Sequence, residues 1–96
     1  MLVLITYDVR TDTQNGKKRL RKVAKECCNY GQRVQNSVFE CVLTEVQLCE
    51  LKDKLHQTMD RINDSIRIYH LNKNENRRVD VMGRDTSLNV EDTLII

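Results

Sequence analysis

The sequence predicts an α+β fold in which two amphipathic helices cover one face of an antiparallel sheet. The first observation is an apolar run at the start of the chain, LVLITYD, made of residues that favour strands. The second is a pair of later segments whose apolar residues recur at helical spacing, and the third is a set of further strand-like runs. A chain of 96 residues with 40% hydrophobic residues is expected to form one small domain.

The first of these runs is predicted to be a central strand. Leu2 and Leu4 lie on one side of it and Val3 and Ile5 on the other, so both of its faces are apolar. A strand that is apolar on both faces is covered on both faces. The run ends in Asp8, whose carboxylate is either a turn cap or a ligand for a cation, and the pattern leaves both alternatives open.

The first helix is expected to follow a turn-forming segment, TDTQNG at residues 11–16. That segment contains several capping side chains, and Gly16 is able to take a positive φ. From Lys17 onward the apolar residues recur at i, i+3, i+4, i+7 and i+8, opposite a basic face. Gly31 is placed to end this helix in the left-handed conformation. The apolar stripe consists of Leu20, Val23, Ala24, Cys27 and Cys28.

The segment Arg33–Leu43 is predicted to be the second strand, and a second helix is expected to follow it. Thr44 and Gln47 fit a capping box, in which each side chain accepts a hydrogen bond from the other residue's backbone. The buried stripe of this helix is predicted to be Leu48, Leu51, Leu55, Met59 and Ile62. Later strands are expected at residues 65–71, 79–82 and 84–96, and Gly83 is expected to close the second of these.

We interpret this order as βαββαβ with an added C-terminal strand, which is the ferredoxin-like arrangement. The core is expected at residues 1–82 and a docking strand at residues 84–96. Both helices cover one face of the sheet, so a second copy, packed sheet against sheet as a two-fold dimer, is the economical cover for the other face. The last strand could then extend the partner's sheet and hide its edge.

The composition argues against several other classes of protein. No run approaches the roughly 18 apolar residues of a membrane span, and the N-terminus lacks the basic lead of a secretory signal. The cysteines form no C-x-x-C pair, so we interpret them as reduced core thiols of a cytoplasmic protein. Neither His56 nor His70 lies at zinc-ligand spacing from them, and His70 is interpreted as structural. The cysteines are Cys27, Cys28, Cys41 and Cys49.

Six basic residues fall within nine positions of the first helix. The net charge of +2 is too small to require a nucleic-acid partner. This positive face is therefore either a solvated helix surface or a surface that binds a nucleic-acid backbone. The six residues are Lys17, Lys18, Arg19, Arg21, Lys22 and Lys25.

Dimerisation would change what a lone carboxylate can do, because a two-fold axis near the end of the first strand brings two copies of Asp8 together. Two carboxylates with backbone carbonyls and waters suit Mg²⁺, which keeps several waters and needs few protein ligands. Near a phosphate, such an ion stabilises developing charge and lowers the pKa of an attacking water.

Two segments, MLVLITYDV and YGQRVQNSVFEC, together resemble the small subunit of the CRISPR spacer-acquisition pair, over residues 1–71. The resemblance implies a metal-dependent endonuclease that is also the central piece of an integration complex. It implies that Asp8 binds Mg²⁺, or another divalent cation such as Mn²⁺, across the dimer axis. Arg19 and Arg21 are candidates for the family's basic residues early in the first helix. The other implied catalytic-site residues are Tyr7, Arg33, Ser37 and Phe39.

Each implied residue also has a structural interpretation. Tyr7 could pack with its hydroxyl satisfied, and Phe39 could be a core or dimer contact instead of a platform for bases. Arg33 could pair with Glu40 or another acid instead of a phosphate. Ser37 is not expected to be a nucleophile, because no histidine lies near it in the sequence.

Two functions follow, and they are compatible. In the enzyme, Mg²⁺ would sit between two copies of Asp8, its bound water would attack a phosphodiester of single-stranded RNA or duplex DNA, and Arg33 would steady the phosphate. In the non-catalytic bridge, the dimer would span two copies of the partner integrase and hold the DNA backbone on its basic helices. Residues 84–96 would dock on the integrase. An RNA-cleaving toxin on the same fold is a weaker third alternative.

Overall fold

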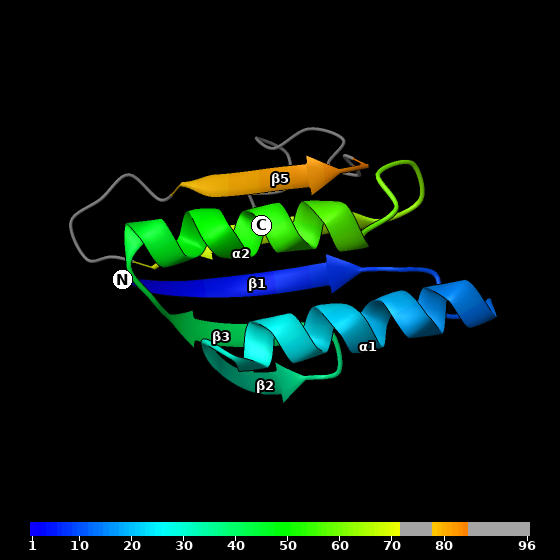
Figure 1. Ribbon diagram of the computed structural model, residues 1–96, viewed down its shortest axis with the longest axis horizontal. Helices are drawn as coiled ribbons and strands as arrows, with labels where there is room; N and C mark the ends of the chain where they lie inside the picture. The colour runs from blue at the N-terminus through cyan, green and yellow to red at the C-terminus, as the bar shows by residue number, and fades with distance from the viewer. Residues whose placement is uncertain (72–77, 85–96) are drawn as a thin grey trace, which may run out of the picture.

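The computed structural model describes residues 1–71 and 78–84, with both helices on one face of an antiparallel sheet (Figure 1). The sheet has five strands in the order β2-β3-β1-β4-β5. This is the ferredoxin-like βαββαβ arrangement with one strand added beside β4, so the predicted fold class is confirmed. The elements are β1 (Leu2–Asp8), α1 (Gln14–Cys28), β2 (Gly31–Gln35), β3 (Val38–Val42), α2 (Glu45–Thr58), β4 (Ser65–His70) and β5 (Val79–Gly83).

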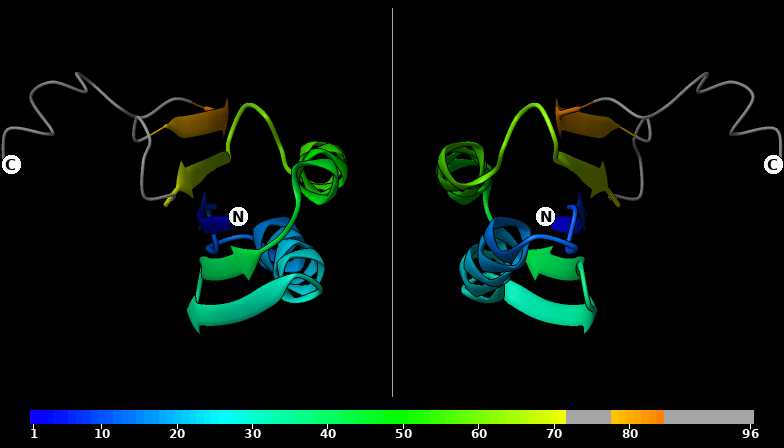
Figure 2. Two further views of the ribbon diagram at one scale, coloured as in Figure 1. Left: turned by 90° about the vertical axis from the view of Figure 1, so that its left-hand side faces the viewer. Right: turned by 90° about the vertical axis from the view of Figure 1, so that its right-hand side faces the viewer.

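The central strand β1 has two different faces. Val3, Ile5 and Tyr7 are at most 2% exposed and belong to the core beneath the helices. Leu2 and Leu4 are half-buried on the opposite face. Seen edge-on, both helices lie on one side of the sheet (Figure 2). No described residue covers the other side, although β1 is apolar there too.

We call this uncovered side the open sheet face. Its rows follow from the strand register, in which Leu4 pairs with Glu40 and Tyr69, and Tyr69 pairs with Val79. Apolar residues dominate it, and Val42 at the end of β3 is 69% exposed. The face comprises Leu2, Leu4, Thr6, Val38, Glu40, Val42, Arg67, Tyr69, Val79 and Val81. The predicted sheet-to-sheet dimer stays a prediction.

Helix α1 begins earlier than expected, because Thr13 is its N-cap and accepts a hydrogen bond from the Gly16 N–H at 3.0 Å. Gly16 is helical and has no positive φ, so that expectation is wrong. It is a glycine because a Cβ there would overlap the carbonyl oxygen of Arg10. The predicted stripe is buried except at its edge, where Cys28 is exposed.

The single predicted strand Arg33–Leu43 is in fact the hairpin β2–β3, with its turn at 36–37, and this hairpin supplies the second strand between the helices that the βαββαβ order requires. The polar turn residues interrupt what reads as one apolar run. Gly31 begins β2 and does not end α1 in the left-handed conformation, which corrects the second glycine expectation. A Cβ on Gly31 would overlap the carbonyl oxygen of Glu40, so the close approach of the two strands requires glycine.

Helix α2 begins as predicted. Thr44 and Gln47 form the reciprocal capping box, with hydrogen bonds of 2.9 Å and 3.1 Å. Its stripe ends at Met59, because the chain leaves the helix after Thr58. Ile62 therefore lies in the following turn with 81% of its surface exposed, and its prediction as a buried residue is wrong.

Strand β5 ends as predicted at Gly83, which has a φ of 82°. The strand expected at 84–96 lies outside the described residues beyond Arg84. The four cysteines are free. Burial raises the pKa of the Cys41 thiol to about 11 and that of Cys27 further. Cys28 and Cys49 are exposed, so for these two the core-thiol interpretation is wrong. The described helices are too short and polar to span a membrane.

Candidate functional site

Asp8 ends β1 on the same side as the open sheet face, because it shares the strand parity of Leu2 and Leu4. Its side chain is 66% exposed. The register pairs Asp8 with Ser65 of β4 and Ser65 with Gly83 of β5, so three strands contribute to one row at this end of the sheet. The carboxylate is therefore presented to solvent on a rigid strand end.

Asp8 forms an ion pair that the sequence did not reveal. Nη2 of Arg84 lies 3.2 Å from Oδ2 of Asp8. The backbone N–H of Arg84 donates to the carbonyl oxygen of Asp64 at 2.8 Å, which fixes Arg84 beside the row. A lone arginine after a glycine gives no local signal for such a contact between residues 76 positions apart.

Tyr7, the neighbour of Asp8, points to the helix side and donates its hydroxyl hydrogen to Oδ2 of Asp64 at 2.5 Å. The structural interpretation of this hydroxyl as a satisfied one is confirmed. Asp64 is fully buried and also accepts the Asp60 backbone N–H at 3.0 Å. Burial first, and then the hydrogen bond to Asp64, raise the pKa of Tyr7 well above its ordinary value. Tyr7 therefore stays protonated at neutral pH.

Arg19 completes this buried network. Its Nε and Nη2 atoms donate to the two oxygens of Asp64 at 2.7 Å and 3.2 Å. The hydrogen bond to Asp64 raises the pKa of Arg19, so the guanidinium keeps its charge. In the sequence Asp64 belongs to a short polar linker, and its burial becomes visible only once α1 and β4 pack together.

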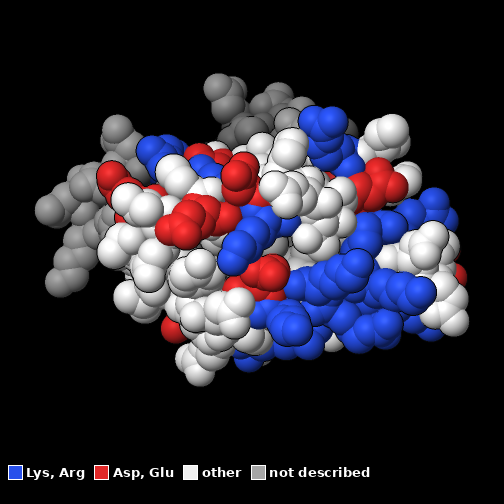
Figure 3. Space-filling view, in the orientation of Figure 1, with Lys and Arg blue, Asp and Glu red and all other residues white. Residues whose placement is uncertain are grey.

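The other basic residues of α1 are exposed, and they dominate the surface over this helix (Figure 3). The sequence pattern therefore places five cations on one solvent-facing strip, which we call the α1 basic face. It consists of Lys17, Lys18, Arg21, Lys22 and Lys25. Arg19 differs from them in that its side chain is only 20% exposed.

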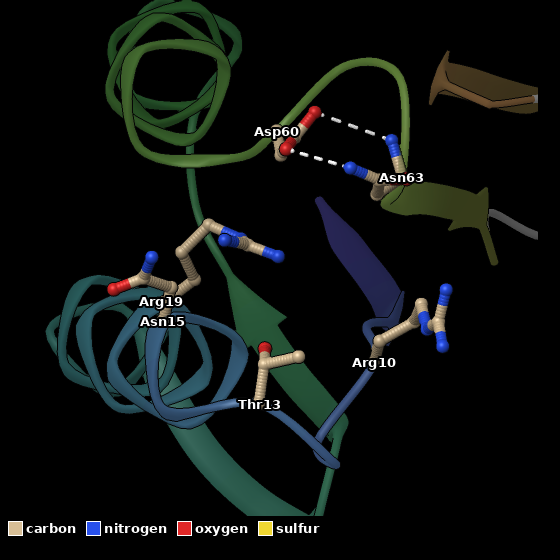
Figure 4. A pocket seen from close by; sticks show the side chains of 6 residues that line it. All are labelled: Arg10, Thr13, Asn15, Arg19, Asp60 and Asn63. Carbon is tan, nitrogen blue, oxygen red and sulfur yellow. Dashed lines mark hydrogen bonds between the residues drawn. The ribbon is translucent and has the colours of Figure 1, made fainter.

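An open pocket lies between the start of α1 and the loop after α2 (Figure 4). Arg19 reaches across it from α1, and Arg10 stands on its other side after the end of β1. On the loop, Asn63 donates to both oxygens of Asp60, with its Nδ2 at 3.0 Å and its backbone N at 3.2 Å. The lining residues are Arg10, Thr13, Asn15, Arg19, Asp60 and Asn63.

Arg33 and Phe39 lie together, on the opposite face of the sheet from Asp8. Phe39 is fully buried in the core, which confirms its interpretation as a core residue. The guanidinium of Arg33 sits 5.6 Å from the centre of the Phe39 ring. Arg33 also donates to the carbonyl oxygen and Oδ1 of Asn36 at 2.7 Å and 3.2 Å. Glu40 lies on the open sheet face instead, so the Arg33–Glu40 pair is not formed.

Ser37 connects the hairpin to the central strand, because its carbonyl oxygen accepts the backbone N–H of Tyr7 at 2.9 Å. It is half-buried in the turn between β2 and β3. The structure thus joins Ser37 to the end of β1, while Arg33 and Phe39 belong to the helix side of the sheet.

His70 lies at the opposite end of β4 from Asp8, with its register partner at Val3. Its Nε2 is 2.9 Å from Oδ2 of Asp80, which also accepts from Nζ of Lys52 at 2.7 Å. Burial acts to raise the pKa of Asp80, but the hydrogen bonds from Lys52 and His70 outweigh it and hold the pKa below its usual range. This cluster ties α2 to β5.

The residues around Asp8 fit a shared divalent cation better than a closed metal cage. Within residues 1–71 and 78–84, no three His, Cys, Asp or Glu side chains gather to hold a metal ion. In the described row Asp8–Ser65–Gly83, Asp8 supplies the one carboxylate. Mg²⁺ is commonly held by one or two carboxylates and keeps several waters. The donor set is thus compatible with Mg²⁺ if a second copy or a substrate phosphate completes it.

These features define a small ferredoxin-like domain with an exposed carboxylate at the end of its sheet and a basic helix beside it. The family model described as CRISPR associated protein Cas2 matches residues 1–79. The chain belongs to this family.

Relatives support this assignment over the full length. The CRISPR-associated endonuclease Cas2 of Halalkalibacterium halodurans is 56% identical over 95 residues, which is 99% of each chain. The CRISPR-associated endoribonuclease Cas2 of Chlorobaculum tepidum is 50% identical over 96 residues, the whole of both chains. The crystal structure of Streptococcus pyogenes Cas2 at pH 6.5 has 58% identity and a TM-score of 0.75, covering 77% of this chain and 89% of that one.

Proposed function

We propose that this chain is a homodimeric endonuclease that cleaves phosphodiester bonds in a Mg²⁺-dependent reaction with Asp8 as its metal ligand. The observation that carries the proposal is that Asp8 is exposed on the same side as the apolar open sheet face. The relatives of this chain that are named endonuclease and endoribonuclease support the activity. The substrate is RNA or duplex DNA.

The dimer follows from the cost of leaving apolar strands in water. The open sheet face exposes Val42, Val79 and Val81 by 69%, 41% and 42%. A second copy packed face to face would remove these side chains from water. The same packing brings Asp8 of each copy toward the shared axis, so one carboxylate becomes two.

The residues near Asp8 have separate tasks in this reaction. When bound, Mg²⁺ supplies charge stabilisation for the phosphate oxygens and lowers the pKa of a water. Asp8 holds the cation on a rigid strand end. Tyr7 does not accept a proton, because its raised pKa and its hydrogen bond to Asp64 keep it as a donor. Tyr7, Asp64 and Arg19 instead hold β1 against α1.

The first test replaces the carboxylate by its isosteric amide. Asp8→Asn should lower Mg²⁺-dependent cleavage of RNA and DNA by at least about a hundredfold, because a lost metal ligand costs several kcal/mol of transition-state stabilisation. Cleavage is measured on both substrates with Mg²⁺ and with a chelator, and the dimer is checked by sedimentation.

Asp12→Asn is the matched control, since Asp12 is an exposed acid in the adjacent turn that pairs with Arg10 and not with the strand end. It should cleave as the wild type does. Full activity in Asp8→Asn would contradict the assignment of the metal ligand.

We further propose that the dimer bridges two copies of a partner integrase and holds the DNA fragment being inserted. The α1 basic face supports this role, because exposed lysines and arginines bind phosphates without reading bases. The family's link to CRISPR supports an adaptation partner. This role needs the basic face and does not need cleavage by Asp8.

The second test reverses charge on the α1 basic face. A variant with Lys18, Arg21 and Lys25 changed to Glu should bind duplex DNA more weakly. The negative slope of log K against log salt should also become less steep, by roughly 0.9 for each DNA phosphate that the variant no longer neutralises. Binding is measured by fluorescence anisotropy over a salt series.

Arg78→Glu beside β5 is the control, because Arg78 is exposed and pairs with Asp80 at the sheet edge opposite β2, away from α1. Unchanged affinity and salt slope in the triple variant would contradict the DNA-binding role. If the Asp8→Asn variant still inserts DNA fragments, the bridging role does not depend on the nuclease activity.

A further inference from the structure

Arg84 is placed beside Asp8 by the fold. The row Asp8–Ser65–Gly83 runs across β1, β4 and β5 at one end of the sheet. Gly83 takes a φ of 82°, and a Cβ there would overlap the backbone carbonyl oxygen of Asp64, so the chain turns at a point that favours glycine. The next residue is Arg84, whose backbone N–H is held by the carbonyl oxygen of Asp64.

The guanidinium of Arg84 forms an ion pair with the same carboxylate that would bind the proposed cation. Its Nη2 lies 3.2 Å from Oδ2 of Asp8. The side chains are 41% and 66% exposed, so the pair contributes little to the stability of the fold. Its main effect is therefore on what else Asp8 is able to bind.

Two other arginines at this end, Arg10 and Arg19, do not share this position. Arg10 and Arg19 each have a carboxylate of their own, so among the described residues Arg84 is the cation paired with Asp8. The pairs are Arg10 with Asp12, Arg19 with Asp64, and Arg84 with Asp8.

We infer that Arg84 is an intramolecular competitor for the divalent cation at Asp8. This inference rests on the proposed function of Asp8 as a metal ligand. A divalent cation must either displace the guanidinium from Oδ2 or bind beside a positive charge, and both lower the affinity. Arg84 thus sets the cation concentration at which the Asp8 site fills. When a cation binds there, the Arg84 guanidinium leaves Oδ2 of Asp8 but remains nearby.

The test measures Mn²⁺ binding by isothermal titration calorimetry, with Mn²⁺ alone as the probe. Arg84→Gln should bind Mn²⁺ about twofold to fivefold more tightly than the wild type, which is the range for one exposed ion pair. Arg84→Lys, which keeps the charge, should bind close to the wild type. Arg10→Gln is the matched control for net charge and should also leave the affinity unchanged.

A second readout follows Arg84 directly. In the wild type, titration with diamagnetic Mg²⁺ should shift the NMR signal of the Arg84 side-chain Nε–H as the ion pair breaks, and Asp8→Asn should remove this shift. The melting temperatures of wild type and Arg84→Gln should agree, because the pair is exposed.

The outcomes separate this inference from the proposed function. Equal Mn²⁺ affinity in wild type and Arg84→Gln, with binding lost in Asp8→Asn, overturns the competitor role and leaves the metal site standing. No Mn²⁺ binding at Asp8 in any variant overturns both. Tighter binding in Arg84→Gln, in a protein that cleaves neither RNA nor DNA, supports the competitor role and counts against the proposed reaction.

Discussion

Tyr7 and Asp8 are adjacent in the sequence, yet they face opposite sides of the sheet. The alternation of a strand sends the Tyr7 hydroxyl to buried Asp64 and leaves the Asp8 carboxylate in solvent. The resemblance groups the two as one catalytic motif. Their surroundings give the two side chains different roles. The buried, protonated phenol of Tyr7 helps to hold β1 against α1, whereas the exposed carboxylate of Asp8 is available to cations.

Tyr7→Phe should therefore reduce stability more than chemistry. Removing the hydroxyl leaves Oδ2 of Asp64 with one donor fewer in a fully buried place, which costs about 1–3 kcal/mol. Urea unfolding measures this loss, and Mn²⁺ affinity at Asp8 serves as the control that should not change. Wild-type stability in Tyr7→Phe would show that the buried hydrogen bond contributes nothing.

The raised pKa of Tyr7 also fixes how the stability difference between wild type and Tyr7→Phe changes with pH. The folded state favours the protonated phenol, so its contribution is fully present below the unfolded pKa of about 10. It is lost as pH rises above that value, because the unfolded chain then releases a proton that the folded chain retains. The stability gap between wild type and Tyr7→Phe should be constant at neutral pH and shrink in alkali.

The arginines of helix α1 have different surroundings. Arg19 and Arg21 look equivalent in the sequence, but two residues turn a helix through about 200°. Arg19 consequently faces the start of β4 and binds Asp64, while Arg21 remains in solvent on the α1 basic face. Of the predicted phosphate-binding residues, Arg19 is thus already held by an internal acid.

Strand β5 depends on contacts at both of its ends. Asp80 binds Lys52 of α2 and His70 of β4 near its start, and Arg84 binds Asp8 just after its end. Among the described strands, β5 pairs with β4 alone, so these polar contacts reinforce that pairing. The contact at its end also brings β5 to the candidate metal site.

The two faces of the sheet differ across the whole molecule. The helices cover one face (Figure 2), and the other carries exposed aliphatic side chains. Val81→Asp on the open sheet face should shift the protein from dimer to monomer, because dimerisation would bury an unpaired carboxylate. Sedimentation velocity over a concentration series measures the shift.

Val46→Asp provides the matched control for this prediction. Val46 is also exposed, at 69%, but it lies on α2 and away from the open sheet face. It should leave the dimer intact. A wild-type monomer, or a dimer that tolerates Val81→Asp, would contradict the proposed interface and with it the pairing of two Asp8 carboxylates.

Local patterns were enough to predict the fold class, the central strand, the Thr44 capping box and the turn at Gly83. Each depends on residues close together in the chain, through side-chain periodicity or backbone capping. The same patterns misplaced Gly16, Gly31 and Ile62. Their roles depend on which backbone passes nearby and where the helix stops.

The contacts around Asp8 depend on packing between distant segments. Asp64 lies 57 positions from Tyr7, and Arg84 lies 76 from Asp8. No spacing rule links such residues, because they meet only when β1, β4 and β5 align in register. Periodicity therefore predicted where a carboxylate would be presented, whereas the three-dimensional packing determined that Arg84 pairs with it.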